Sequence, residues 1–197
     1  MLLTIFVAIS CTGKKSEDAD HDASRGSLAN VEGEMYMLVG TYTSNEGSKG
    51  IYVYKFDTET AEADSVSMVE VANPSYLTVS MDGEFVYSVG ENGEDDSYAH
   101  AFSFDRENGQ LKLIDSQLTS GSSPAYIALD EGSTNLFTAN YGGGSISQFN
   151  INRDGALSPL SNLYQFEGSG EDPERQQQPH LHSVRYSPDG KYLFAAD

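Results

Sequence analysis

Two histidines near the carboxyl end of the 197-residue chain could carry out acid–base chemistry. His180 and His182 are separated by one residue, so on an extended strand their side chains project to the same side. Histidine exchanges protons near neutral pH, so His182 could take a proton from water or give one to a leaving oxygen. The structural alternative is a histidine that only bonds a backbone carbonyl at the end of a strand.

Arg175 stands in a long loop that precedes the two histidines. Its guanidinium could hold a phosphate or a carboxylate with two hydrogen bonds, and the chain's net charge of −19 makes such a cation conspicuous. The alternative is an exposed arginine paired with an acidic neighbour, the candidates being Glu171, Asp172 and Glu174. Tyr141 either faces the same site or packs between neighbouring sheets.

Metal and phosphate-loop chemistry find little support in the same residues. His180 and His182 would need a third ligand to bind a metal, and no carboxylate is fixed in place by spacing. Gly142-Gly143-Gly144 lacks the following Lys-Ser or Lys-Thr and the helix that a phosphate loop requires. We expect a tight turn at these glycines, no metal and no cofactor.

The strands that must position these groups recur about every fifty residues. Apolar strands end at residues 40, 90, 140 and 197, at intervals of 50, 50 and 57, and the long loop around Arg175 accounts for the last interval. Shorter strands that begin near Pro74, Pro124 and Pro179 precede the last three of them. Several short strands in each fifty-residue period are typical of β-propeller blades. We count three strands in the first unit, four in each of the next two and two in the last.

Composition agrees with an all-β protein. The chain has 19 Gly, 12 Tyr and 9 Phe, which suit short strands and tight turns. Acidic residues number 30 and basic residues 11, which argues against sequence-independent binding to nucleic acid. We therefore expect a β-propeller of about three and a quarter blades. Because such an array has open edges, we expect a longer protein truncated to its N-terminal portion, or else a ring completed by oligomerisation.

The first residues resemble a bacterial lipoprotein signal. The apolar run from Leu2 to Ile9 is too short to span a bilayer, and Ala8-Ile9-Ser10-Cys11 resembles a lipobox. We expect a signal over residues 1–11 that is lipidated at Cys11, a flexible acidic linker over 12–34, and the propeller over 35–197. The protein would then contact a membrane only through this anchor in the cell envelope. The alternative is a cytoplasmic protein whose N-terminus is apolar by chance. The run departs from the lipoprotein pattern in that no Lys or Arg precedes it.

One long segment carries a family pattern. It combines Pro173-Glu174-Arg175-Gln176, Pro179-His180-Leu181-His182-Ser183 and Ser187-Pro188-Asp189-Gly190-Lys191, and it is joined by Val39–Thr43 and Ala139–Ser145. With these motifs the chain resembles the lactonase family of seven-bladed propellers, which includes the propeller-type 6-phosphogluconolactonases. The resemblance runs from about Met35 to Asp197 and covers about the first half of a family member.

The resemblance implies a reaction and a set of site residues. It implies hydrolysis of a small sugar lactone, with His182 as the catalytic residue, and it places Arg and Glu partners in later blades beyond Asp197. We assign substrate contacts to Arg175, His180 and Tyr141. A muconate-type cycloisomerase and a non-catalytic surface propeller that binds a sugar or a protein are the alternatives.

Overall fold

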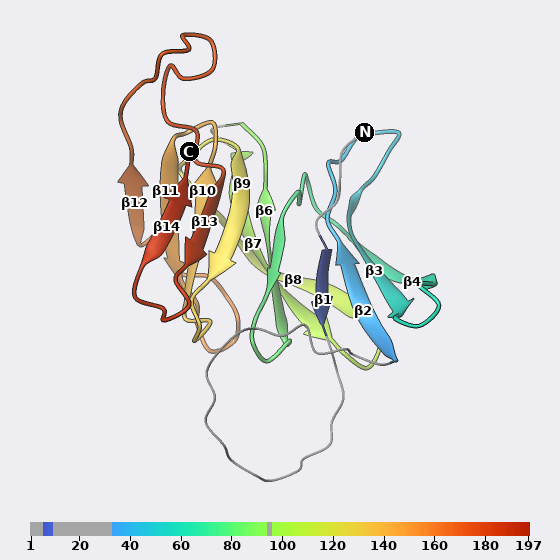
Figure 1. The fold of residues 1–197 in the computed structure, drawn as a ribbon. Coiled ribbons are helices and arrows are strands. Elements are labelled where there is room, and N and C mark those ends of the chain that lie inside the picture. The colour runs from blue at the N-terminus through green and yellow to red at the C-terminus, as the bar shows by residue number, and fades with distance from the viewer. Residues whose placement is uncertain (1–5, 10–32, 94–95) are drawn as a thin grey trace.

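The computed structural model describes residues 6–9, 33–93 and 96–197, and these form antiparallel sheets of consecutive strands (Figure 1). No α-helix occurs in these ranges, which confirms the all-β prediction. The first sheet holds β1 (Phe6–Ile9), β2 (Glu34–Val39), β3 (Gly50–Asp57) and β4 (Ala63–Glu70). The second holds β5 (Leu77–Val79), β6 (Phe85–Gly90), β7 (Tyr98–Asp105) and β8 (Gln110–Leu118). The third holds β9 (Pro124–Leu129), β10 (Asn135–Asn140), β11 (Ser145–Asn150) and β12 (Asn162–Gln165), and the fourth holds β13 (Ser183–Tyr186) and β14 (Leu193–Ala196).

The first sheet differs from the sequence prediction, because it has four strands rather than three. Its additional strand is β1, which lies antiparallel to β2 with Phe6 opposite Val39 and Ile9 opposite Tyr36. The residues of β1 are part of the apolar run that we expect to be a leader. Cys11 and most of the predicted linker lie outside the described residues. Within the described part of the chain, no helix is long and apolar enough to cross a membrane.

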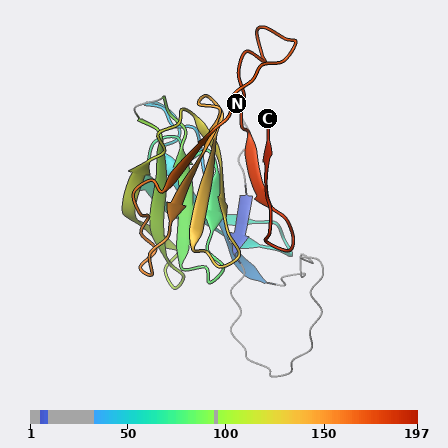
Figure 2. The same cartoon turned by 90° about the vertical axis from the view of Figure 1, so that its left-hand side faces the viewer.

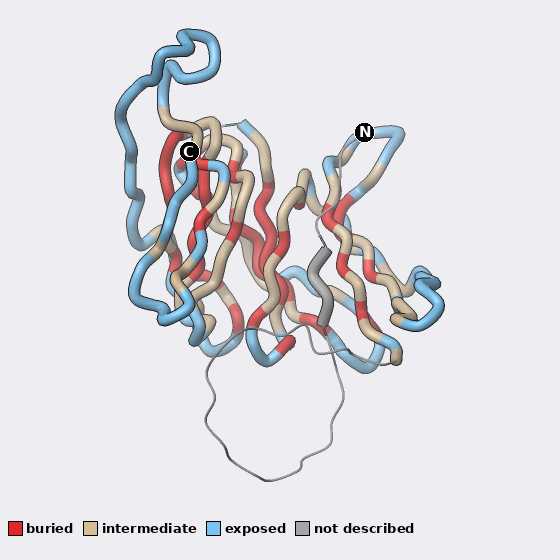
Figure 3. Tube along the Cα trace, in the orientation of Figure 1, coloured by how far each residue is buried: buried red, intermediate tan, exposed pale blue. Residues whose placement is uncertain are grey.

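Apolar side chains pack in a cluster between each sheet and the next, as in neighbouring propeller blades. Most of the buried residues lie along the strands (Figure 3). Between the first and second sheets, Leu38 and Ile51 pack with Val86 and Phe102. The second and third sheets bury another cluster, and the third and fourth a smaller one. Burial of this apolar area is the main favourable contribution to folding, so each sheet is stabilised by the one beside it.

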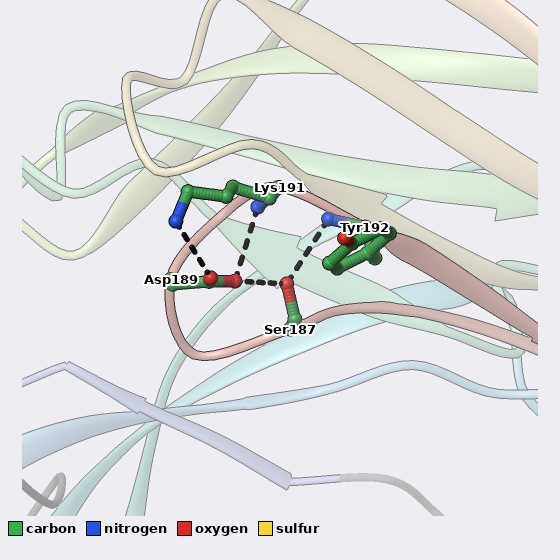
Figure 4. A network of polar contacts seen from close by, with 4 residues as sticks. All are labelled: Ser187, Asp189, Lys191 and Tyr192. Carbon is green, nitrogen blue, oxygen red and sulfur yellow. Dashed lines mark hydrogen bonds and ion pairs between the residues drawn. The ribbon is translucent and has the colours of Figure 1, made fainter.

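A polar turn repeats between the first two strands of the later sheets and fixes their register. In the turn from β13 to β14, Ser187 Oγ donates to Asp189 Oδ1 (2.6 Å) and accepts from the Tyr192 amide (3.0 Å) (Figure 4). In the second sheet, Ser80 makes the same two bonds with Asp82 (2.6 Å) and with the Phe85 amide (2.9 Å). The polar side chains therefore close these turns at equivalent repeat positions.

These turns correct how the repeats within this chain match one another. The amides of Ser80, Asp130 and Ser187 each bond the carbonyl at the start of the following strand, so the three residues are equivalent. Counting back from them, Leu181 rather than Pro179 matches Pro74 and Pro124. The proline at 179 therefore belongs to the long loop and does not mark the start of the inner strand.

Candidate functional site

A cavity of about 650 Å³ lies where the loop between β12 and β13 meets the ends of β10 and β14. This loop projects above the sheets and the C-terminal residue lies next to its base (Figures 1 and 2). Side chains that could contact a polar ligand make up much of the wall, among them Tyr141, Glu167, Arg175, Gln178, His180, His182 and Asp197. The structure thus brings together the four residues nominated from the sequence, whose chemical roles stay predictions.

Tyr141 lies at the centre of this group. It follows β10 directly, and its amide donates to the carbonyl of Ser123 (2.9 Å). Its ring stacks on the imidazole of His180, with centroids 4.6 Å apart at 26°, and meets the imidazole of His182 edge-on at 5.8 Å and 87°. One tyrosine ring therefore contacts both histidines.

Three backbone contacts hold the histidines in place. Nδ1 of His180 lies 3.0 Å from the Tyr141 carbonyl oxygen. Since a carbonyl only accepts, this nitrogen is the donor. The amide of His180 donates to Asp197 Oδ1 (2.8 Å), and that of His182 donates to the Ala196 carbonyl (2.8 Å). The imidazole of His182 makes no hydrogen bond within the described residues and is exposed on the cavity wall.

His180 also occupies a repeat position whose role the sequence analysis missed. By the register of the turns, Asn73 and Ser123 are its counterparts in the second and third sheets. Asn73 Oδ1 accepts from the Thr43 amide (2.8 Å), and the Ser123 amide donates to the Asn92 carbonyl (2.9 Å). Each of the three residues therefore bonds to the loop that ends the second strand of the preceding sheet. We call these bridges the rim contacts.

Arg175 lines the cavity without an ion-pair partner among the described residues. Asp172 instead accepts from the backbone amides of Glu174 (2.9 Å) and Arg175 (3.1 Å), so its carboxylate shapes the loop. The acidic neighbours considered from the sequence therefore do not form ion pairs with this guanidinium. The cation is available to a ligand.

The loop that carries Arg175 is held by its own hydrogen bonds. The amide of Gly170 donates to the carbonyl of Gln176, and the amide of Gln176 donates to the carbonyl of Asp172 (both 2.8 Å). Gln178 Nε2 reaches the carbonyl of Gly142 (2.8 Å), which fastens the loop to the glycine turn after β10. That turn places Gly144 at a φ of +59°, a conformation that suits glycine, as expected from the sequence.

A second polar cluster lies at the matching place in the preceding repeat and was also missed. Glu91 and Ser75 are the counterparts of Tyr141 and His182. Glu91 Oε2 accepts from the hydroxyls of Tyr42 (2.7 Å) and Ser75. Burial, and secondarily the Glu91 carboxylate, raise the pKa of Tyr42 to about 12. Among the described residues, no three histidine, cysteine or acidic side chains are grouped as metal ligands.

Residues 36–197 match the family model described as lactonase, 7-bladed beta-propeller. The chain belongs to this lactonase family. This confirms the fold inferred from the repeats: the sheets are blades of a seven-bladed propeller. It also confirms the resemblance carried by the sequence motifs.

Named relatives and solved structures agree with this membership. The lactonase-family chain is 34% identical over 163 residues to a 6-phosphogluconolactonase of Formosa agariphila, and 33% identical over 162 residues to one of Bacillus subtilis. These matches cover 82% and 81% of this chain but 46% and 45% of the relatives. The chain thus spans a little less than half the length of the curated relatives it matches.

Two solved structures show the same fold at higher identity. A Bacteroides fragilis protein, provisionally named a 6-phosphogluconolactonase, is 52% identical with a TM-score of 0.81, and the match covers 87% of this chain and 47% of that one. The periplasmic gluconolactonase of Pseudomonas aeruginosa is 36% identical with a TM-score of 0.75, over 81% of this chain and 46% of that one.

Proposed function

We propose that this chain contributes blades and the His182 cavity to an enzyme that hydrolyses a sugar lactone, of the 6-phosphogluconolactonase type. The observation that carries the proposal is one cavity wall shared by an imidazole without hydrogen-bond partners in the described chain and a guanidinium without an ion pair there. The names of the relatives from Formosa and Bacillus support the same class of reaction.

In the proposed reaction, His182 accepts a proton from water as the water oxygen adds to the lactone carbonyl carbon. The bond between that carbon and the ring oxygen then breaks, and the imidazolium returns the proton to the ring oxygen. Water and lactone are thereby converted into a hydroxy acid, with no other reactant. Tyr141 would orient the imidazole through its ring edge, and His180 would hold Tyr141 from the other side.

Arg175 would attract and hold the negative charge of the substrate or product. Hydrolysis releases a carboxylate, and a 6-phosphorylated lactone carries a phosphate in addition. A guanidinium binds either group with two parallel hydrogen bonds. In a chain of net charge −19, a local cation is needed to offset the repulsion of such a ligand.

The cellular location bears on which lactone is used. We propose that the protein is anchored in the cell envelope through Cys11, where sugar phosphates are scarce. The related structure from Pseudomonas is of a periplasmic gluconolactonase. Its name supports an unphosphorylated lactone as the substrate of a protein located in the cell envelope. Comparison of glucono-δ-lactone with its 6-phosphate decides between the two substrates.

The test is hydrolysis of both lactones by the complete gene product, measured as acid release above the spontaneous rate. We expect His182→Gln to lower kcat/KM by about 100-fold, the usual scale for loss of a general base. Glu174→Gln is the matched control, because Glu174 lies in the same loop but does not line the cavity. Native rates in His182→Gln would remove this histidine from the mechanism, and no hydrolysis of either lactone would reject the proposed function.

A further inference from the structure

A second hollow, separate from the His182 cavity, lies along the first strands of three successive sheets. It is a groove of about 540 Å³ lined by residues of β5, β9 and β13 and of the turns that follow β5 and β9. No residue lines both hollows. Binding in this groove is therefore independent of the proposed lactone hydrolysis.

Two tyrosines from adjacent blades form one wall of the groove. Tyr76 and Tyr126 occupy equivalent positions in successive repeats, and their ring centroids are 4.0 Å apart at 37°. Both side chains are half-buried. Burial raises the pKa of Tyr76, and its hydroxyl pairs with that of Tyr126.

Arg185 from the third of these strands completes the wall. Its Cζ lies 5.8 Å from the centroid of the Tyr126 ring, a cation–π distance that orders an otherwise exposed side chain. Arg185 and the two tyrosines thus form a row across three blades. The guanidinium and the two hydroxyls hydrogen-bond one another, so the donors left for a ligand are the guanidinium N–H groups that do not face the hydroxyls.

The charge of Arg185 is not compensated within the described residues. Neither of the ion pairs found there involves it. The carboxylates of Asp130 and Glu131 also line the groove. The two oxygens of Asp130 accept hydrogen bonds from Thr134 and Asn135. The carboxylate of Glu131 lies beside the turn at Gly190. A guanidinium held by two hydroxyls, with no carboxylate paired to it in the described chain, is therefore open to an anion.

We propose that Arg185 and the hydroxyls of Tyr76 and Tyr126 form a binding site for the oxyanion of a small ligand, a carboxylate or a phosphate. The planar guanidinium presents paired N–H donors that match either group. The two phenol oxygens hold the guanidinium in one orientation, a constraint that a bare surface arginine lacks. The site would hold such a group along the inner strands, apart from the reacting atoms in the His182 cavity.

Calorimetric titration of the complete gene product tests this site, with inorganic phosphate and gluconate as the two probes. We expect Arg185→Gln to weaken binding at least about tenfold, the scale of one lost charged hydrogen bond. Arg185→Lys keeps the positive charge but loses the paired N–H donors of the guanidinium, and it should bind the two probes with intermediate affinity. Tyr126→Phe keeps the ring under Arg185 and should weaken binding about threefold.

Arg153→Gln is the control, because Arg153 is exposed in the turn after β11 and does not line the groove. Equal affinity in native protein and Arg185→Gln would overturn the proposal. Equal weakening by Arg153→Gln and Arg185→Gln would also overturn it, since binding would then follow net charge alone. Binding of phosphate but not gluconate would assign a phosphate ligand, and binding of both would assign oxyanions in general.

Discussion

Phe137 and Phe194 occupy the same position in successive repeats, yet Phe137 is 6% exposed and Phe194 is 62% exposed. Phe137 is covered by the fourth sheet, where Tyr186 meets its ring edge-on with centroids 5.8 Å apart. Phe194 lies on β14, where it and the residues after it are exposed. The contribution of an aromatic residue at this repeat position therefore depends on the sheet that follows it.

The two phenylalanines provide a matched pair of stability variants. Phe137→Ala should lower the free energy of unfolding of this chain by about 3 kcal/mol, because it opens a cavity between the third and fourth sheets. Phe194→Ala should change it by less than about 1 kcal/mol, because its ring is already in water. Urea denaturation followed by circular dichroism measures both. Similar losses in the two variants would contradict the packing described for these sheets.

Tyr141 should act through its ring and its backbone. Tyr141→Ala removes the contacts with both imidazoles and should lower lactone hydrolysis by the complete gene product about tenfold or more. Tyr141→Phe keeps both ring contacts and the carbonyl that accepts from His180, so its rate should stay within about twofold of native. An equal loss in the two variants would instead place the Tyr141 hydroxyl in contact with the substrate.

Arg175 should affect substrate binding more than turnover. Arg175→Gln should raise KM about tenfold for a phosphorylated lactone and leave kcat within about twofold, because the guanidinium is assigned to an anion held equally in the ground and transition states. The Glu174→Gln variant again serves as the control. A fall in kcat with unchanged KM would assign Arg175 to the reacting centre.

His100 should make folding sensitive to mild acid. The side chain is buried and its Nδ1 pairs with Ser116 Oγ at 2.7 Å, while Nε2 has no partner among the described residues. Burial lowers its pKa to about 4, and Asp96 and Asp115 only partly oppose this. Between pH 4 and the ordinary value of about 6.5, the unfolded chain binds the proton and the folded chain does not, so stability falls as pH falls.

The loss assigned to His100 should approach about 3 kcal/mol at pH 4. Urea denaturation at several pH values between 7 and 4, on the native chain and on His100→Gln, measures it. The variant cannot titrate at this position, so its stability should decline less steeply over this range. Parallel declines would show that acidic groups alone cause the sensitivity.

Cys11, which lies outside the described residues, is predicted to be lipidated. Radiolabelled palmitate fed to bacteria that express the protein should be incorporated into native protein but not into Cys11→Ser, because this is the only cysteine of the chain. Ser10→Ala keeps a small residue before the cysteine and should still be labelled. Label that persists in Cys11→Ser, or is absent from native protein, would reject the lipoprotein prediction.

The sequence was sufficient to predict the strands and the repeat, because alternating apolar residues and turn residues are local signals. It was not sufficient for the register of the fourth sheet. Pro179 looks like Pro74 and Pro124, but its neighbours belong to a longer loop whose shape depends on contacts such as that of Gln178 with Gly142. The sequence also did not predict β1 as a strand, since a short apolar run fits a leader and a strand equally well.

The candidate site was predicted in its members but not in its arrangement. The spacing of His180 and His182 pointed to one site, and both contact the ring of Tyr141. The bridging role of His180 depends on the loop after β10 lying beside it, and that proximity is created only when the third and fourth sheets pack together. Nonlocal contacts of this kind leave no mark on the spacing of residues.

The rim contacts have a consequence for how order is distributed along the molecule. Each rim contact joins a sheet only to the sheet before it, so the position of each sheet depends on that of its predecessor. The imidazole of His182 stands at the last step described. The packing of the fourth sheet against the third therefore sets where the His182 imidazole lies relative to the Tyr141 ring.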